Sequence, residues 1–289
     1  MIPPAFEYLR PKTIPEAVAF LKQYGDDAKI LSGGQSLIPM MKLRIARPSY
    51  LIDINRISGL SYIKEEAGFL KIGGLSREAD LEASALIRSK YPIILDTAHV
   101  IADPQVRNLA TIAGNLAHGD PANDHPATML ALGAQIVATG PAGERIIPIE
   151  EFFLSVFSTA LKPGEILTEI RIPIPPAHSG GAYLKLERKV GDFATAAVAA
   201  QVTLDGNGAV QKAGIGLTNV GPTPIKARKA EEFLRGKKVD EANARQAGQL
   251  AAEEAQPSSD LRGPAEYKRG LVKELARRAL SRAAERAEA

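Results

Sequence analysis

The sequence predicts an α+β protein of two domains, and three observations support that class. Short apolar runs alternate with helix-like stretches over the first 172 residues, as in strand–helix units. Residues 173–181 hold three prolines and two glycines and read as a linker. Beyond the linker, three strand-like runs come first and helical periodicity follows. We therefore place a boundary near residue 176, which gives domains 1–176 and 177–289.

The composition is that of a globular protein and excludes several classes of site. The 289 residues are 45% hydrophobic and 24% charged, which excludes global disorder. The chain has no cysteine, so it cannot carry a thiolate-bound metal, an iron–sulfur cluster or a cysteine nucleophile. No apolar run approaches the ~18 residues of a membrane span, and the N-terminus lacks the order of a secretory signal. We expect a cytoplasmic protein.

The charge balance does not predict nucleic-acid binding. The 36 basic and 33 acidic residues give a net charge of only +3. Residues 262–289 hold eight basic residues against four glutamates, a local charge of +4. This basic stretch is either a solvated helix face or a docking surface for an acidic partner.

The N-terminal residues predict a parallel strand–helix–strand unit. A strand over 28–32 ends at a glycine pair, and an apolar-periodic stretch over 37–43 predicts a short helix. The next apolar run, 50–54, supplies the second strand.

The middle of the chain adds further elements around one irregular segment. The patterns predict strands over 69–74, 134–139, 145–149 and 166–172, and helices from Ser76 to about Ser89, over 92–100 and over 124–132. Residues 103–126 are rich in Gly, Pro, Asn, Asp and His and have weak periodicity, so we expect a long irregular segment. Such segments inside compact domains are often functional.

The second domain is predicted to be a three-stranded antiparallel sheet followed by helices. The strands cover 182–189, 194–204 and 209–218, and the helices cover 226–235, 240–255 and 265–286. The turn Asp205-Gly-Asn-Gly208 joins the last two strands as a hairpin.

Two small-residue loops are candidates for binding one anionic group. Residues 32–37, Ser-Gly-Gly-Gln-Ser-Leu, lie at a strand-to-helix turn, where glycines let successive amides point outward. Residues 111–115, Thr-Ile-Ala-Gly-Asn, form a second loop of this kind. A glycine turn also forms without any ligand, so the loops alone leave both interpretations open.

Two further groups carry ionisable side chains. His118, Asp120, Asp124 and His125 could ligate a metal, but Asp-Pro and Asn-Asp are also common turn and cap residues. Along residues 183–187, strand alternation places Tyr183, Lys185 and Glu187 on one face. That face is either exposed or directed at a ligand.

Taken together, these motifs resemble a known family. The two loops, His-Gly-Asp-Pro-Ala-Asn-Asp at 118–124 and Thr-Asn-Val-Gly-Pro-Thr at 218–223 look like the FAD-binding medium subunits of the carbon monoxide dehydrogenase / xanthine dehydrogenase (molybdenum hydroxylase) family. The resemblance extends to Asp260-Leu-Arg-Gly263 and covers nearly the whole chain. It implies an FAD-binding domain of the vanillyl-alcohol-oxidase type, with two lobes of about 1–57 and 58–176.

The resemblance also implies which residues hold FAD. The first turn would hold the pyrophosphate, Asp124 would accept from the adenosine half, and Lys185 and Phe193 would approach the isoalloxazine. The full implied set is Lys29, Ile30, Leu31, Ser32, Gly33, Gly34, Gln35, Ser36, Leu37, Ala102, Val106, Ala110, Thr111, Gly114, Asn115, Asp124, Ile166, Leu167, Lys185 and Phe193.

The sequence departs from the family pattern at three positions. Ser32 replaces the usual alanine, a small polar change that we expect to be tolerated. Gln35 replaces the histidine of some carbon monoxide dehydrogenases. Ala113 stands where glycine is usual, and alanine resists a positive φ by about 1 kcal/mol. If the loop needs that backbone geometry, Ala113 weakens FAD binding.

By this resemblance the protein is an electron-transfer subunit without a catalytic acid or base of its own. Iron–sulfur clusters on a [2Fe-2S] small subunit would feed its FAD, and a molybdopterin-binding large subunit would act on the substrate. Neither the substrate (carbon monoxide, an aldehyde or an N-heterocycle) nor the electron acceptor follows from the sequence. Two alternatives stay open: a self-sufficient FAD oxidase or dehydrogenase, and a metal-dependent hydrolase built on the His and Asp cluster.

Overall fold

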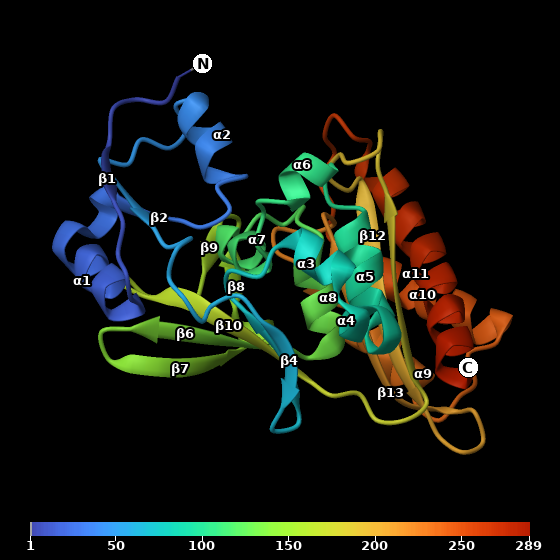
Figure 1. The fold of residues 1–289 in the computed structure, drawn as a ribbon. Coiled ribbons are helices and arrows are strands. Elements are labelled where there is room, and N and C mark those ends of the chain that lie inside the picture. Colours follow the sequence, from blue (N-terminus) through green and yellow to red (C-terminus); the bar gives the residue numbers. More distant parts are fainter. Residues whose placement is uncertain (1) are drawn as a thin grey trace.

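The computed structural model describes residues 2–289, and a small parallel sheet opens the chain (Figure 1). Its strands are β1 (Glu7–Leu9), β2 (Ala28–Leu31) and β3 (Tyr50–Asp53), and its helices are α1 (Ile14–Tyr24) and α2 (Leu37–Lys42). Both β1 and β2 pair in parallel with the central β3, which confirms the predicted strand–helix–strand unit. The sequence analysis did not predict β1 or α1, although Thr13 caps α1 by accepting from the Glu16 amide.

A five-stranded sheet in the order β4-β5-β10-β6-β7 forms the second lobe, with antiparallel neighbours throughout. Its strands are β4 (Ile63–Glu66), β5 (Phe69–Gly73), β6 (Gln135–Gly140), β7 (Gly143–Pro148) and β10 (Ile166–Pro173). A small hairpin of β8 (Phe153–Ser155) and β9 (Ser158–Thr159) lies between β7 and β10 in the chain.

Helices lie between this sheet and the C-terminal part of the chain (Figure 1). They are α3 (Glu78–Ala83), α4 (Ala85–Lys90), α5 (Pro92–His99), α6 (Pro104–Arg107), α7 (Ile112–His118) and α8 (His125–Leu132). The prediction of one helix up to Ser89 is wrong: Ser84 adopts an extended conformation, ends α3, and caps α4 by accepting from the Ile87 amide.

The segment 103–126 is more regular than its composition predicts. The caps of α6 and α7 are the side chains of Asp103 and Thr111, and α7 ends at Gly119 in the left-handed conformation. These caps are sequence signals that weak periodicity concealed, because each helix is too short to show a repeat.

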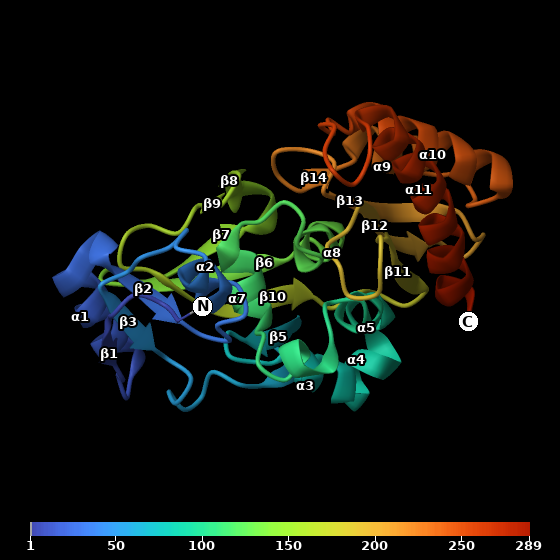
Figure 2. The same ribbon diagram turned by 90° about the horizontal axis from the view of Figure 1, so that it is seen from above.

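The C-terminal sheet has the order β11-β12-β13-β14 and carries helices on its outer face (Figures 1 and 2). Its strands are β11 (Ser179–Leu186), β12 (Ala196–Leu204), β13 (Val210–Thr218) and β14 (Ile225–Lys226), and its helices are α9 (Arg228–Leu234), α10 (Glu241–Glu254) and α11 (Ala265–Glu288). The predicted hairpin at 205–208 is confirmed: Asp205 accepts from the amides of Asn207 and Ala209. The prediction missed only the short fourth strand.

The other face of this sheet packs on helices α5 and α8. Gly214 and Gly216 lie against α8, where an added Cβ would come within 2.0 Å of the carbonyl oxygens of Ala131 and Ala127. Tyr183 and Ala197 join the hydrophobic core of the second lobe. The inner face of the C-terminal sheet therefore contributes to the core of the second lobe, whereas its outer face forms a separate core with α9, α10 and α11. The predicted boundary near residue 176 falls in the connection between β10 and β11. The division into domains there stays a prediction.

Within residues 2–289, no helix has the length and apolar character needed to cross a membrane.

Candidate cofactor site

A cavity with a volume of about 580 Å³ lies where the two lobes and the C-terminal sheet meet. It falls in the size range of pockets that hold small molecules and cofactors. The β2–α2 turn, the α6–α7 region, the start of β10 and the β11–β12 connection all contribute to its wall. Segments from across the sequence thus converge on one site.

The first glycine turn forms one edge of the cavity. Gly34 has a φ of 77°, which favours glycine. At Gly33, an added Cβ would lie 2.4 Å from the Leu109 carbonyl oxygen. Both glycines are therefore required, one for its backbone conformation and one for the close approach of the second loop.

The second loop lies directly against the first. The hydroxyl oxygens of Ser32 and Thr111 are 2.9 Å apart, and the Thr111 hydroxyl also accepts from the Gly114 amide at 3.1 Å. The expectation that both loops face one group is thus consistent with their geometry. The concern about Ala113 is wrong in its premise, because Ala113 lies inside helix α7 and does not have a positive φ.

An unpartnered atom in the second loop indicates that the cavity wall is built for a ligand. The side-chain oxygen of Asn115 is buried without a hydrogen-bond partner and belongs to a residue that lines the cavity. Its main-chain oxygen accepts from Asn123 at 2.7 Å, which holds the residue in place. Buried polar atoms are rarely left unsatisfied, so a donor from a bound molecule fits here. Together with the two close-packed loops, this fits a nucleotide cofactor.

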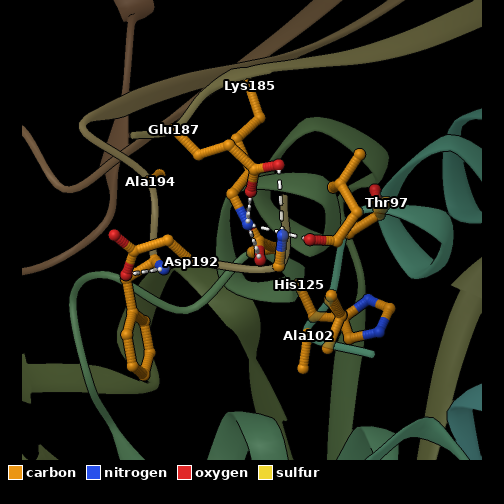
Figure 3. Close-up of polar contacts among 12 residues, drawn as sticks. Thr97, Ala102, His125, Lys185, Glu187, Asp192 and Ala194 are labelled. Atoms are coloured by element: carbon orange, nitrogen blue, oxygen red, sulfur yellow. Dashed lines mark hydrogen bonds and ion pairs between the residues drawn. The ribbon is translucent and has the colours of Figure 1, made fainter. Parts of the chain in front are cut away.

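A buried polar cluster closes the far end of the cavity (Figure 3). Asp124 accepts from the Tyr183 hydroxyl at 2.5 Å and from the Lys185 ammonium at 3.0 Å. Lys185 also donates to the Val100 carbonyl at 2.9 Å and pairs with Glu187 at 3.2 Å. The predicted face of Tyr183, Lys185 and Glu187 is confirmed, and it is directed inward, towards Asp124.

Burial sets the protonation of this cluster. It raises the pKa of Asp124, while the Lys185 ammonium and the Tyr183 hydroxyl oppose the rise. Burial and the adjacent Asp124 carboxylate raise the pKa of Tyr183 well above its ordinary value, so the hydroxyl stays protonated. Burial likewise lowers the pKa of His118, which lines the same cavity. At neutral pH the His118 ring is therefore uncharged.

The structure brings together all but one of the residues that the resemblance implies. Leu31 is the exception: it is absent from the wall and packs behind the turn, with its Cδ1 3.1 Å from the position of a Gly34 Cβ. The Lys185 ammonium lies 3.0 Å from the Asp124 carboxylate, so the two residues do not serve opposite ends of the cofactor as the resemblance implies. The sequence analysis missed Phe157, which follows β8, and Glu165, which precedes β10. No local pattern marks these two residues, since each reaches the cavity only through the packing of distant segments.

The metal interpretation of the His and Asp cluster is wrong for the described residues. Nowhere in residues 2–289 do three or more His, Cys, Asp or Glu side chains gather in a metal-binding arrangement. His125 is fully buried and contacts Glu78 at 2.7 Å, whereas the Asp124 carboxylate belongs to the Lys185 cluster. The two consecutive side chains, Asp124 and His125, thus have different partners.

The basic C-terminal stretch is largely engaged within the chain. Arg277 and Arg278 pair with Glu274 on the same helix, and Arg286 pairs with Asp96 of α5. This favours the interpretation of a structural helix over a docking surface for an acidic partner.

These features define a protein that binds a nucleotide cofactor. They are the two-lobed α/β unit, the cavity lined by the first glycine turn and the second loop, and the sheet-and-helix unit attached to them. Comparison with known proteins identifies its kind. Residues 4–175 match the family described as the FAD binding domain in molybdopterin dehydrogenase, and residues 181–283 match the CO dehydrogenase flavoprotein C-terminal domain. The chain therefore belongs to the FAD-binding flavoproteins of molybdopterin dehydrogenases, its cofactor is FAD, and it is an oxidoreductase subunit.

Individual relatives span the same length as this chain. The carbon monoxide dehydrogenase medium chain of Afipia carboxidovorans is 47% identical, with 99% of each chain covered. The glyceraldehyde dehydrogenase medium chain of Sulfolobus acidocaldarius is 35% identical, with 98% of this chain and 100% of the relative covered. A crystal structure of the Cu,Mo-CO dehydrogenase contains a chain with a TM-score of 0.96 and 47% identity, covering 99% of this chain and 100% of that one. These matches confirm the α+β fold class and the resemblance.

Proposed function

We propose that this protein carries electrons within a molybdenum hydroxylase complex, from iron–sulfur clusters on a partner subunit, through its FAD, to an external acceptor. The observation that carries the proposal is a cavity lined by the first glycine turn, by the second loop and by Asp124 with Lys185. FAD supplies the redox chemistry when it is bound, since it accepts and releases electrons singly or in pairs.

The residues of the chain position the cofactor and do not react with it. Ser32 to Ser36 hold the pyrophosphate, and Thr111 with Asn115 close the second side. Ala102, Val106 and Ala110 form an apolar wall that excludes water, and Ile166 and Leu167 extend it. The buried Asp124 and Lys185 pair holds the Val100 carbonyl and thereby the loop that carries Ala102. Phe193 lies at the rim, 46% exposed, within reach of a planar ring.

Electrons must come from outside this chain. It has no cysteine and so cannot bind an iron–sulfur cluster through thiolates. Relatives over the whole chain are named medium chains, which implies assemblies with other chains. We propose a molybdopterin-binding large subunit and a [2Fe-2S] small subunit as partners. The cytoplasmic location stays a prediction.

In this proposal the substrate binds and reacts on the molybdopterin-binding large subunit. One relative is named for carbon monoxide and another for glyceraldehyde, so the flavoprotein is compatible with different reducing substrates. The 47% identity to the carbon monoxide dehydrogenase chain makes carbon monoxide the first substrate to assay.

The test is the reduction of the flavin in the complete assembly. The purified complex is mixed anaerobically with carbon monoxide, an aldehyde or an N-heterocycle, and the flavin absorbance is followed. We expect bleaching with one substrate class, and no bleaching when this chain alone receives the same substrate. Turnover by the isolated chain would overturn the proposal in favour of a self-sufficient oxidase or dehydrogenase.

A further inference from the structure

A line of polar contacts runs behind the first glycine turn, outside the cavity wall. It begins at the Asp53 carboxylate, at the end of β3, which accepts from the Tyr8 hydroxyl. Asp53 also accepts from the backbone amide of Asn55 at 2.9 Å and from its side-chain nitrogen at 2.7 Å. These contacts leave the Asn55 amide group with one orientation.

Asn55 connects the first turn with the second lobe. Its side-chain nitrogen donates to the Ser32 carbonyl at 2.6 Å, and its side-chain oxygen accepts from the Arg77 guanidinium at 2.6 Å. Arg77 precedes α3, and its own amide donates to Asp80 at 2.8 Å. The contact with Asp80 fixes the main chain of Arg77, and the contact with Asn55 fixes its guanidinium.

The Nη1 group of the Arg77 guanidinium contacts the segment that leads into the second loop. It donates to the Leu109 carbonyl, the same oxygen that would lie 2.4 Å from a Cβ on Gly33. Arg77 also forms an isolated antiparallel bridge with Thr111. One planar side chain therefore fixes the approach of the second loop to the first, through a carbonyl on one side and Asn55 on the other.

The guanidinium of Arg77 donates to two neutral oxygens, whereas the buried Lys185 pairs with two carboxylates. Burial lowers the pKa of Arg77, and the nearby Asp80 and Asp53 carboxylates oppose that shift and offset part of its charge. Arg77 is half-buried, so its field is less screened than that of a surface cation. A cation held beside an anion nest stabilises a bound diphosphate even without touching it.

We propose that Arg77, acting with Asn55, is a positioning residue for the FAD pyrophosphate. It holds the Leu109 carbonyl against the first glycine turn and adds a positive charge behind that turn. The inference deepens the proposed function, because it rests on the assignment of the pyrophosphate to residues 32–36. Neither Arg77 nor Asn55 lines the cavity, so their role is to place the groups that do.

The test compares ligands that share different parts of FAD. The full chain in its assembly is freed of flavin, and binding constants are measured for FAD, for ADP, which keeps the pyrophosphate and adenosine, and for riboflavin, which has no phosphate. The variants are Arg77→Met, which loses the charge, and Arg77→Lys, which keeps the charge but cannot hold both acceptors. Arg88→Met on the exposed face of α4 is the matched control.

We expect Arg77→Met to weaken FAD and ADP about tenfold or more, by a similar factor, and to leave riboflavin within about twofold. Arg77→Lys falls in between, and only Arg77→Met flattens the salt dependence of ADP binding, since that dependence reports the charge. Equal weakening of all three ligands, or unchanged FAD binding, would overturn the proposal. If Arg77→Met does not fold, Arg77→Lys provides the test, through the factor by which it weakens ADP binding compared with the factor for riboflavin. Failure of the wild-type chain to bind ADP at all would instead count against the placement of the pyrophosphate.

Discussion

The hydroxyl oxygens of Ser32 and Thr111 lie 2.9 Å apart although 79 residues separate them in the chain. Ser32 follows β2 in the first lobe, and Thr111 caps the start of α7 in the second. The contact therefore joins the two lobes at the place where the two small-residue loops meet. Only the Thr111 hydroxyl also accepts from the Gly114 amide, so we expect the loss of Thr111 to destabilise the protein more than the loss of Ser32.

Replacing Thr111 with Val should cost more than replacing Ser32 with Ala. Thr111→Val loses both the contact with Ser32 and the cap on the Gly114 amide, so we expect a loss of about 1–2 kcal/mol in the free energy of unfolding. Ser32→Ala removes one partly buried neutral hydrogen bond and should cost about 1 kcal/mol or less. Denaturant unfolding of the full chain measures both. Equal losses would show that the cap contributes nothing.

Gly33→Ala should abolish tight FAD binding while the chain still folds. The new Cβ would lie 2.4 Å from the Leu109 carbonyl oxygen and 2.8 Å from the Ala110 Cα, so the second loop must move away. We expect FAD affinity to fall about tenfold or more, which corresponds to a loss of about 1.4 kcal/mol in binding free energy. Flavin content and a titration with FAD measure the change.

Gly206→Ala is the matched control for this substitution. Gly206 lies in the hairpin turn between β12 and β13, and no atom would come within 4 Å of its added Cβ. FAD affinity should remain at the wild-type value. If Gly33→Ala also bound FAD normally, the close contact of the two loops would not determine the shape of the site.

Local patterns predicted the parts of the fold that have local causes. The strand–helix–strand unit at 28–54 follows from hydrophobic periodicity and a glycine pair, and the hairpin at 205–208 follows from its turn residues. The helix break at Ser84 was missed because a serine is tolerated inside a helix as well as at a cap. The weak period of residues 103–126 concealed α6 and α7 for a similar reason, since four and seven residues are too few to repeat.

The residues of the site likewise fall into those that local sequence patterns predict and those that they do not. The loops 32–37 and 111–115 are visible in the sequence because glycine and small polar residues cluster there. Asn55 and Arg77 are not, because each acts through a contact with a carbonyl far along the chain, Ser32 for one and Leu109 for the other. The inward direction of Lys185 was left open by strand alternation, which places a side chain on a face but does not say what covers that face.

Lys185→Met should destabilise the protein in a way that depends on pH. Without the ammonium, the buried Asp124 carboxylate is uncompensated, and we expect a loss of about 3–5 kcal/mol at pH 7. Burial already raises the pKa of Asp124, and removal of Lys185 raises it further. A carboxyl with a raised folded-state pKa is more stable protonated, so its contribution is lost as the pH rises from about 4, the unfolded value, through the folded value.

The measurement is denaturant unfolding of wild type and Lys185→Met between pH 4 and pH 8. The deficit of the variant should be smallest near pH 4 and should grow as the pH rises. The double variant Asp124→Asn/Lys185→Met should recover part of the loss at pH 7, because it removes the Asp124 charge and leaves only the less buried Glu187 carboxylate without the ammonium. A deficit that stays the same at every pH would mean that lost packing of the lysine stem, and not the charge of Asp124, causes the effect.

Arg286→Ala should weaken the attachment of the last helix to the flavin-binding part. Arg286 on α11 donates to both carboxylate oxygens of Asp96 on α5, at 2.6 and 3.1 Å, and to the Gly181 carbonyl at 2.5 Å. Hydrogen bonds to charged groups contribute about 1.5–3 kcal/mol, so we expect a loss of that order in the free energy of unfolding.

Arg278→Ala is the control: its side chain is 62% exposed and pairs only with Glu274, so its loss should stay below about 1 kcal/mol. Because Tyr183 and Ala197 still pack in the hydrophobic core of the second lobe, unfolding of Arg286→Ala should remain a single transition. Two separate transitions would show that the Asp96 contact, and not the packing of the C-terminal sheet on the second lobe, couples the two parts.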